Sequence, residues 1–183
     1  ANSLAIPILL DPVGAGATSV RKNAVYTLLN ELSISVLRCN AGELAAVFDA
    51  EYQIGGVDSP TGIANVKVMA VDIARRYHTV FAVTGEIDTV TDGNATFTLH
   101  NGVSLLPQLT GTGCMTSALT GAFLTANNPL VAAVCGITYM SVCGEEAFAR
   151  LSSKDGLGSF SVYLHDAMSR MKPKRLGRKA VVK

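Results

Sequence analysis

The stretch AIPILLDPVGAGATSVRKNAVYTLLNELSISVL, residues 5–37, decides the fold of this 183-residue chain. It opens with an apolar run that ends at Leu10 and is followed by a turn rich in glycine and proline, which is the pattern of a buried strand. Ser19 is then expected to cap a helix over residues 20–32, where apolar residues recur at steps of three and four. A second apolar run at 34–37 completes a strand, a helix and a strand, the crossover unit of a parallel sheet.

The same alternation of elements continues to residue 171. We expect a third strand over 79–83, helices over 40–48, 61–77, 111–126, 129–151 and 160–171, and loops at 55–60 and 156–159, the second ending in Ser159 as a helix cap. Two β-rich runs separated by Asp92-Gly93 predict an antiparallel hairpin added to the parallel strands. The predicted fold is one α/β domain over residues 1–171, with a mostly parallel sheet, a β-hairpin edge and helices on both faces, followed by a basic tail over 172–183.

Composition and charge narrow the class of protein. With 49% apolar and 16% charged residues, the chain is globular rather than disordered or fibrous. The tail holds six of the fifteen Lys and Arg residues and no acid, so residues 1–171 carry nine bases against fourteen acids, a net charge of −5. Such a body repels nucleic-acid phosphates, which excludes nucleic-acid binding outside the tail. We interpret the tail as a solvated extension.

Other features bear on cell location and on the start of the chain. The four cysteines lack the spacing of a zinc site, so we expect reduced thiols. No basic and apolar leader precedes the first strand, which favours the cytoplasm. The longest apolar stretch, Leu130–Cys143, has fourteen residues, fewer than the roughly twenty that cross a bilayer, and predicts a buried helix. Because a buried strand begins almost at once, we also expect a segment to precede Ala1.

Two polar motifs follow the first two strands, at the edge where open parallel sheets bind their ligands. Asp11 opens the sequence DPVGAG and could bind a metal ion, although an ordinary turn with a solvated carboxylate fits equally well. Asn40 and Glu43 are spaced to share one side of a helix and could hold hydrated Mg²⁺ through oxygen atoms. Taken alone, this pair is more typical of a helix N-cap with a capping box.

Two further motifs are typical of phosphate chemistry. Thr84-Gly85 ends the third strand and would let a nucleotide approach, though such a pair is often only a turn. The sequence GTGC, residues 111–114, opens a long helix, where free amides and the helix dipole can stabilise a transferring phosphoryl group. Cys114 lies in the first turn, where a thiol ionises more readily than elsewhere, unless it is simply a small buried apolar residue. The sequence contains no Walker motif and no GxGxxG after the first strand.

Six motifs in a fixed order resemble the hydroxyethylthiazole kinase family: DPVGAGAT (11–18), LRCNAGEL (37–44), VTGEIDTVTDG (83–93), LHNG (99–102), LTGTGCMTSAL (109–119) and GSF (158–160). The resemblance spans about residues 6–171 and the larger, carboxyl-terminal part of that family's domain. It implies a ribokinase-like fold and transfer of the ATP γ-phosphoryl group to the primary alcohol of 4-methyl-5-(2-hydroxyethyl)thiazole, a salvage step in thiamine synthesis. It also implies Mg²⁺ as cofactor, ATP as co-substrate and a homotrimer with active sites between subunits.

The resemblance also implies roles for individual residues. The implied site residues are Arg38 and Thr84 for ATP, Gly111, Thr112 and Gly113 for the substrate, Asp11, Asn40 and Glu43 around Mg²⁺, and Cys114 as the catalytic residue. Cys114 stands where most ribokinase-like enzymes place an aspartate base, and a cysteine there is typical of the thiazole kinases. Cys39 stands where the family usually has glycine, and a side chain there could crowd the phosphate loop.

Two alternative functions stay open at this stage. The first is another small-alcohol kinase or an ATP-dependent hydrate dehydratase of the same superfamily, which usually carries aspartate at the position of Cys114. The second is a non-catalytic nucleotide-binding fragment. It is favoured because the family's amino-terminal segment, which supplies opening strands and part of the thiazole pocket, is missing before Ala1.

Overall fold

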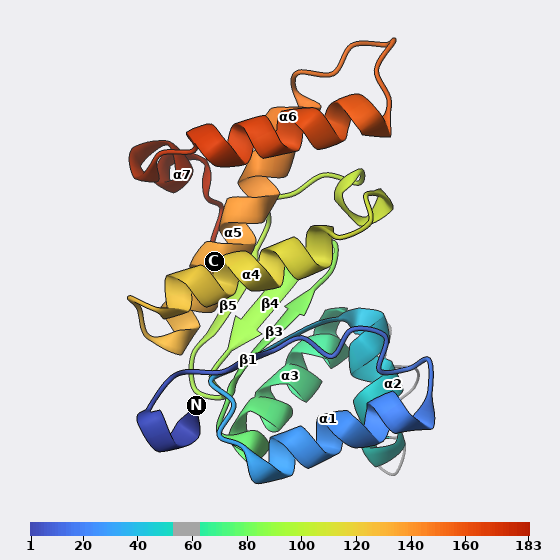
Figure 1. Cartoon of the computed structure of the whole chain (residues 1–183), viewed down its shortest axis with the longest axis vertical. Coiled ribbons are helices and arrows are strands. Elements are labelled where there is room, and N and C mark those ends of the chain that lie inside the picture. The colour runs from blue at the N-terminus through green and yellow to red at the C-terminus, as the bar shows by residue number, and fades with distance from the viewer. Residues whose placement is uncertain (53–62) are drawn as a thin grey trace.

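A five-stranded sheet forms the centre of the computed structural model, which describes residues 1–52 and 63–183 (Figure 1). Its strands lie in chain order: β1 (Leu9–Leu10), β2 (Val36–Asn40), β3 (Val80–Thr84), β4 (Asp88–Thr91) and β5 (Thr96–Leu99). β1, β2 and β3 are parallel, whereas β4 runs antiparallel to both β3 and β5. The predicted parallel strands with a hairpin edge are therefore confirmed, and Gly93 takes a φ of 88° in the turn between β4 and β5.

Helices cover both faces of this sheet. They are α1 (Ser19–Glu31), α2 (Ala41–Tyr52), α3 (Ile63–Tyr77), α4 (Thr112–Leu124), α5 (Pro129–Phe148), α6 (Leu157–Arg170) and α7 (Pro173–Lys179), with short 3₁₀ turns at η1 (Asn2–Leu4) and η3 (Leu106–Gln108). Figure 1 shows α1, α2 and α3 on one side of the strands and α4 and α5 on the other, with α6 lying across the far end of α5. Three apolar clusters fill the contacts between these layers, as expected for an α/β domain.

Alternate residues of the central strands face the two helical layers. In β2, Leu37 and Cys39 lie in the core formed with α1, α2 and α3, while Val36 lies in the core formed with α4 and α5. β3 follows the same alternation. Because successive side chains along a strand point to opposite faces, Arg38 lies on the α4 side of the sheet.

The first strand begins later than predicted, and the first helix is capped by a different residue. Only Leu9–Leu10 of the apolar run form strand pairs, and Pro7, just before, has no amide hydrogen to extend the ladder. Thr18 caps α1 in place of Ser19, because its side-chain oxygen accepts the Arg21 N–H at 3.3 Å.

The predicted loop before the last long helix is shorter than expected. α6 begins at Leu157, with Gly156 as its N-cap, so Ser159 lies inside the helix and does not cap it. Glycine can occupy the N-cap position because the helix start requires a non-helical backbone rather than a side-chain acceptor. The loop predicted at 55–60 lies outside the described residues.

Most residues of the basic tail are exposed, in keeping with the predicted solvated extension, but several of them also contact the protein. Arg175 Nε and Lys179 Nζ lie 2.5 Å and 3.4 Å from Glu146 Oε1, on a carboxylate side chain that is only 10% exposed. Lys183 exchanges two backbone hydrogen bonds with Thr98 of β5. The edge strand and the nearly buried carboxylate both need partners, and the tail supplies them.

The long apolar helix α5 is a core helix. By length and composition it could cross a membrane, and it is the one such helix among the residues that the structure describes. However, 61% of its most apolar window is buried inside the protein, against the sheet and against α4 and α6. This agrees with the buried helix predicted for Leu130–Cys143.

Candidate functional site

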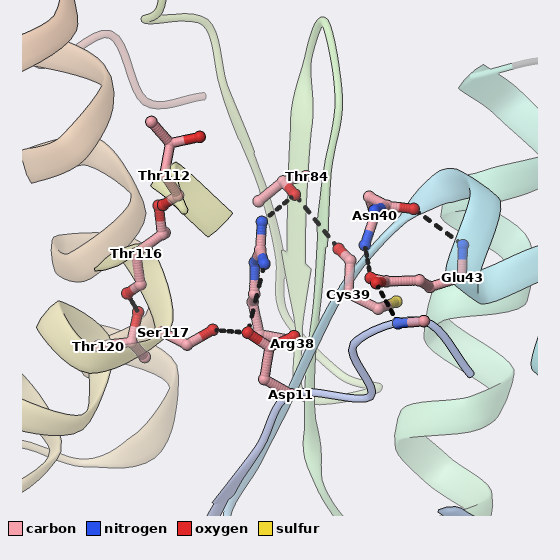
Figure 2. Close-up of polar contacts among 11 residues, drawn as sticks. Asp11, Arg38, Cys39, Asn40, Glu43, Thr84, Thr112, Thr116, Ser117 and Thr120 are labelled. Atoms are coloured by element: carbon pink, nitrogen blue, oxygen red, sulfur yellow. Dashed lines mark hydrogen bonds and ion pairs between the residues drawn. The ribbon is translucent and has the colours of Figure 1, made fainter. Parts of the chain in front are cut away.

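One cavity of about 1030 Å³ brings together all nine residues that the sequence analysis assigned to the site. The lining includes Asp11, Arg38, Asn40, Glu43, Thr84, Gly111, Thr112, Gly113 and Cys114. These residues come from the carboxyl ends of β1, β2 and β3, from the start of α2 and from the start of α4. Figure 2 shows six of them, Asp11, Arg38, Asn40, Glu43, Thr84 and Thr112. Parallel strands end at the same edge of a sheet, so residues far apart in the chain meet there.

Arg38 lies at the centre of the polar contacts in this cavity. Its Nη2 donates to Thr84 Oγ1 at 2.7 Å, and its Nη1 forms an ion pair with Asp11 Oδ2 at 3.6 Å. Its Nε is buried and has no hydrogen-bond partner among the described residues. The guanidinium also lies against Gly113, where a Cβ atom would stand 3.0 Å from Nη1. A buried cation with a donor to spare is suited to binding an anionic phosphate.

Asp11 uses only one of its two carboxylate oxygens. Oδ2 accepts the Ser117 hydroxyl at 2.6 Å in addition to its ion pair with Arg38, and Figure 2 shows this line of contacts from α4 to β2. Oδ1 is buried and has no partner within the described ranges. An unpaired buried oxygen costs free energy unless a ligand satisfies it. Ser117 was not predicted as a site residue, although its spacing of three from Cys114 places both on one side of α4.

Asn40 and Glu43 form a capping box at the start of α2. The Glu43 N–H donates to Asn40 Oδ1 at 2.8 Å, and the Asn40 N–H donates to Glu43 Oε2 at 3.1 Å. Glu43 Oε1 also accepts the N–H of Gly14, which has a φ of 65°, so this carboxylate fixes the loop after β1. Among the side chains that the structure describes, no group of three or more His, Cys, Asp or Glu residues is placed to hold a metal ion. The helix-cap alternative from the sequence is thus what these contacts form.

The start of α4 presents a glycine turn and a thiol to the cavity. Gly111 is the N-cap with a φ of 96°, a backbone conformation that favours glycine, and no side chain that the structure describes caps the helix. The first amides of an α-helix have no partner inside the helix, which leaves donors for an anion. Cys114 is exposed and lines the cavity, so it is not a small buried residue. The Thr112 hydroxyl, in contrast, is tied to the backbone oxygens of Leu106 and Leu109.

The Cys39 side chain does not crowd the phosphate loop. Its side chain is 1% exposed and lies in the core with α1, α2 and α3, on the face of β2 opposite to Arg38. It is not among the residues that line the cavity. Burial raises the pKa of the Cys39 thiol far above its ordinary value, so it stays protonated. The two-residue period of the strand separates this side chain from the site.

Asp88 also lines the cavity and was not predicted as a site residue. Its carboxyl group is buried, and Oδ1 accepts the N–H of Gly85 at 2.9 Å. Burial raises the pKa of Asp88 to about 6, against the opposing effects of the Gly85 N–H and the Arg38 charge. A buried carboxyl with such a pKa inside a cavity is typical of functional sites. Its position within the motif VTGEID, three residues after Gly85, was the available signal.

Comparison with known sequences places these features in a family. The family model for the Hydroxyethylthiazole kinase family matches residues 1–174. The hydroxyethylthiazole kinase of Alkaliphilus oremlandii is 43% identical over 171 residues, which cover 92% of this chain and 63% of the relative. That of Haemophilus influenzae is 38% identical over 181 residues, covering 98% of this chain and 68% of the relative. The chain spans 63% and 61% of the length of the two Alkaliphilus relatives, less than two thirds of either.

Solved structures agree with this placement. A hydroxyethylthiazole kinase protein from Pyrococcus horikoshii matches 100% of this chain and 66% of its own with a TM-score of 0.86, at 37% identity. The pyridoxal kinase of Staphylococcus aureus, at 18% identity, shares the fold over 97% of this chain and 61% of its own with a TM-score of 0.59. The fold is therefore ribokinase-like, as predicted. From the family match over residues 1–174 and these relatives, we conclude that the chain belongs to the hydroxyethylthiazole kinase family.

Proposed function

We propose that this chain transfers the γ-phosphoryl group of ATP to the primary alcohol of 4-methyl-5-(2-hydroxyethyl)thiazole, a salvage step in thiamine synthesis. The observation that carries the proposal is the single cavity that holds Arg38, Asp11 and the glycine-rich start of α4 together. Membership of the family supports the substrate, because the relatives are named hydroxyethylthiazole kinases.

The start of α4 would bind the phosphoryl group during transfer. Phosphoryl transfer spreads charge over the equatorial oxygens, so fixed donors at those oxygens lower the barrier. The Thr112 N–H already donates to the Leu109 carbonyl, so the amides of Gly113 and Cys114, with the positive end of the helix dipole, would supply such donors. Gly113 keeps this surface free of a side chain and lets the Arg38 guanidinium approach it.

Arg38 and Thr84 would bind the nucleotide phosphates. The Thr84 hydroxyl accepts Nη2 of Arg38 and donates to the Cys39 carbonyl at 3.3 Å, so it fixes one edge of the guanidinium. The Nε of Arg38 is buried and has no partner in the described part of the chain, so an acceptor that reached it would satisfy it. A fixed, planar cation matches the geometry of phosphate oxygens.

The residues present fit a hydrated magnesium ion better than a directly bound one. Asp11 lines the cavity and its Oδ1 is a buried acceptor with no partner among the described residues, whereas both Glu43 oxygens and Asn40 Oδ1 already accept backbone amides. Asp11, with Asn40 and Glu43 at the same edge, would therefore hold Mg²⁺ through its waters, which this ion keeps readily. When bound, Mg²⁺ would neutralise part of the charge on the nucleotide phosphates.

Cys114 would act on the primary hydroxyl group of the thiazole substrate. Its exposed thiol lies one helical turn before Ser117, which bonds to Asp11, so the hydroxyl of the substrate would be placed between a thiol and a carboxylate. Because the transition state of phosphoryl transfer is loose, positioning and charge stabilisation contribute more than the base does. We therefore expect Cys114 to contribute less to the rate enhancement than the groups that position the phosphates and stabilise their charge.

Cellular context follows from the same proposal. We propose a cytoplasmic protein that forms a homotrimer with active sites between subunits. Light scattering after size-exclusion chromatography measures the mass directly, and a monomeric mass would contradict the trimer.

The test is release of ADP from Mg-ATP that depends on hydroxyethylthiazole. Turnover with the thiazole and none with pyridoxal or water is the expected result, and Arg38→Ala is the inactive control. The alternative to be separated is a non-catalytic nucleotide-binding chain. Calorimetric binding of Mg-ATP without binding of the thiazole, together with no turnover, would support this alternative and refute the kinase.

A further inference from the structure

Asp88 is a buried acid in the cavity to which the proposed phosphoryl transfer gives no role. It is the first residue of β4 and follows the three-residue connection Gly85–Ile87 from β3. It is 5% exposed, and it reaches back across this connection to accept the Gly85 N–H at 2.9 Å. A hydrogen bond to an ionised carboxylate is shorter and stronger than one between neutral groups, so Asp88 holds Gly85 firmly.

A continuous line of contacts joins this bond to the phosphate-binding cation. Gly85 follows directly after Thr84, whose hydroxyl accepts Arg38 Nη2 at 2.7 Å and donates to the Cys39 carbonyl at 3.3 Å. A shift of the backbone at Gly85 would move Thr84 and release one edge of the guanidinium. Asp88 therefore constrains Arg38 without touching it.

The opposite end of the same hairpin shows what an ordinary turn aspartate looks like. Asp92 accepts the N–H groups of Asn94 and Ala95, both at 2.8 Å, and it stays partly exposed, with the pKa of its carboxyl lowered by these bonds. Asp88 makes one bond of this kind and is nevertheless buried, so ionising it costs free energy, as its raised pKa shows. A turn alone does not require that cost.

We propose that Asp88 is a positioning residue for the nucleotide end of the cavity: by holding the Gly85 amide it fixes Thr84, and through Thr84 it keeps the Arg38 guanidinium oriented toward the phosphates. The inference rests on the proposed nucleotide-binding function and names the residue that organises it. It predicts that the two aspartates of the hairpin have separable effects.

Isothermal titration calorimetry with Mg-ATP on the full chain separates these effects. Asp88→Ala is expected to weaken binding about five- to tenfold, because the loss of one fixed hydrogen bond frees the turn. Asp92→Ala removes two backbone contacts from the far end of the hairpin and is expected to lower thermal stability with affinity unchanged. Asp88→Asn keeps an oxygen acceptor without the charge, so its affinity should lie between those of Asp88→Ala and the unsubstituted chain. Asp88→Val, which suits a strand and lacks the acceptor, replaces Asp88→Ala if the latter does not fold.

The outcomes distinguish failure of the proposed kinase function from failure of the proposed role of Asp88. An unsubstituted chain that binds no Mg-ATP overturns the proposed function and the role of Asp88 with it. Binding by the unsubstituted chain that Asp88→Ala leaves within twofold overturns the role of Asp88 alone. Equal losses of affinity in Asp88→Ala and Asp92→Ala also overturn it, because they would reflect general loosening of the hairpin.

Discussion

Replacing Asp88 by asparagine measures what the buried carboxylate costs the fold. Asparagine has nearly the same shape and keeps an oxygen that can accept the Gly85 N–H, but it has no charge to remove from water. At neutral pH the carboxyl of Asp88 is ionised in a buried position. We therefore expect Asp88→Asn to be more stable than the unsubstituted chain at neutral pH.

The magnitude follows from the pKa of Asp88, which is about 6 in the folded protein against an ordinary 3.8. The folded state binds this proton more tightly than the unfolded state, so the free energy of unfolding falls as pH rises from about 4 to about 6. The full effect is on the order of 3 kcal/mol. Asparagine forms a weaker bond to the Gly85 amide than a carboxylate does, so the expected gain at neutral pH is about 1–3 kcal/mol.

Urea unfolding at pH 4 and at pH 7.5 tests this reasoning. The two proteins should have nearly equal free energies of unfolding at pH 4, and that of the variant should be the higher one at pH 7.5. In a thermal scan at pH 7.5 its Tm should rise by about 2–4 °C for each kcal/mol. Asp92→Asn is the matched control with the opposite sign, because the lowered pKa of Asp92 contributes stability that is lost as pH falls. A difference between Asp88→Asn and the unsubstituted chain that is the same at both pH values would refute the argument.

Three further predictions concern the start of α4, the contact between α4 and α5, and the basic tail over residues 172–183. Cys114→Ala is expected to lower the rate of thiazole phosphorylation less than Arg38→Ala does, and steady-state kinetics showing complete loss in Cys114→Ala would contradict this. Gly136→Ala should lower the free energy of unfolding by about 1–3 kcal/mol, because the added Cβ would stand 2.6 Å from the Thr120 Cα; unchanged urea unfolding would contradict this. Glu146→Gln should make the tail more sensitive to trypsin, because Arg175 and Lys179 would lose the carboxylate with which they form ion pairs. An unaltered rate of digestion would count against this prediction.

Local patterns predicted the elements well and their ends less well. The hairpin at Asp92-Gly93 and the helix that opens after Gly111 were recognisable because each depends on a few neighbouring residues and on a positive φ that glycine adopts easily. The helix cap moved by one residue, from Ser19 to Thr18, since both side chains can accept the same kind of bond.

The candidate site was predicted in part. The motifs placed Asp11, Arg38 and Cys114 at one edge of a sheet, and the structure places them in one cavity. The motifs could not reveal that Ser117 bonds to Asp11, because that contact joins residues 106 positions apart. Nor could they show that Asp88 is buried.

The sequence by itself determined the order of strands and helices, the glycine positions and the family, because periodicity, turn chemistry and short motifs are properties of neighbouring residues. Only the tertiary structure decided which face of β2 carries Arg38 and which carries Cys39, which carboxylate is buried, and where the basic tail binds. These depend on the packing of distant segments, since desolvation and ion pairing are set by the surroundings of a group rather than by its neighbours in the chain.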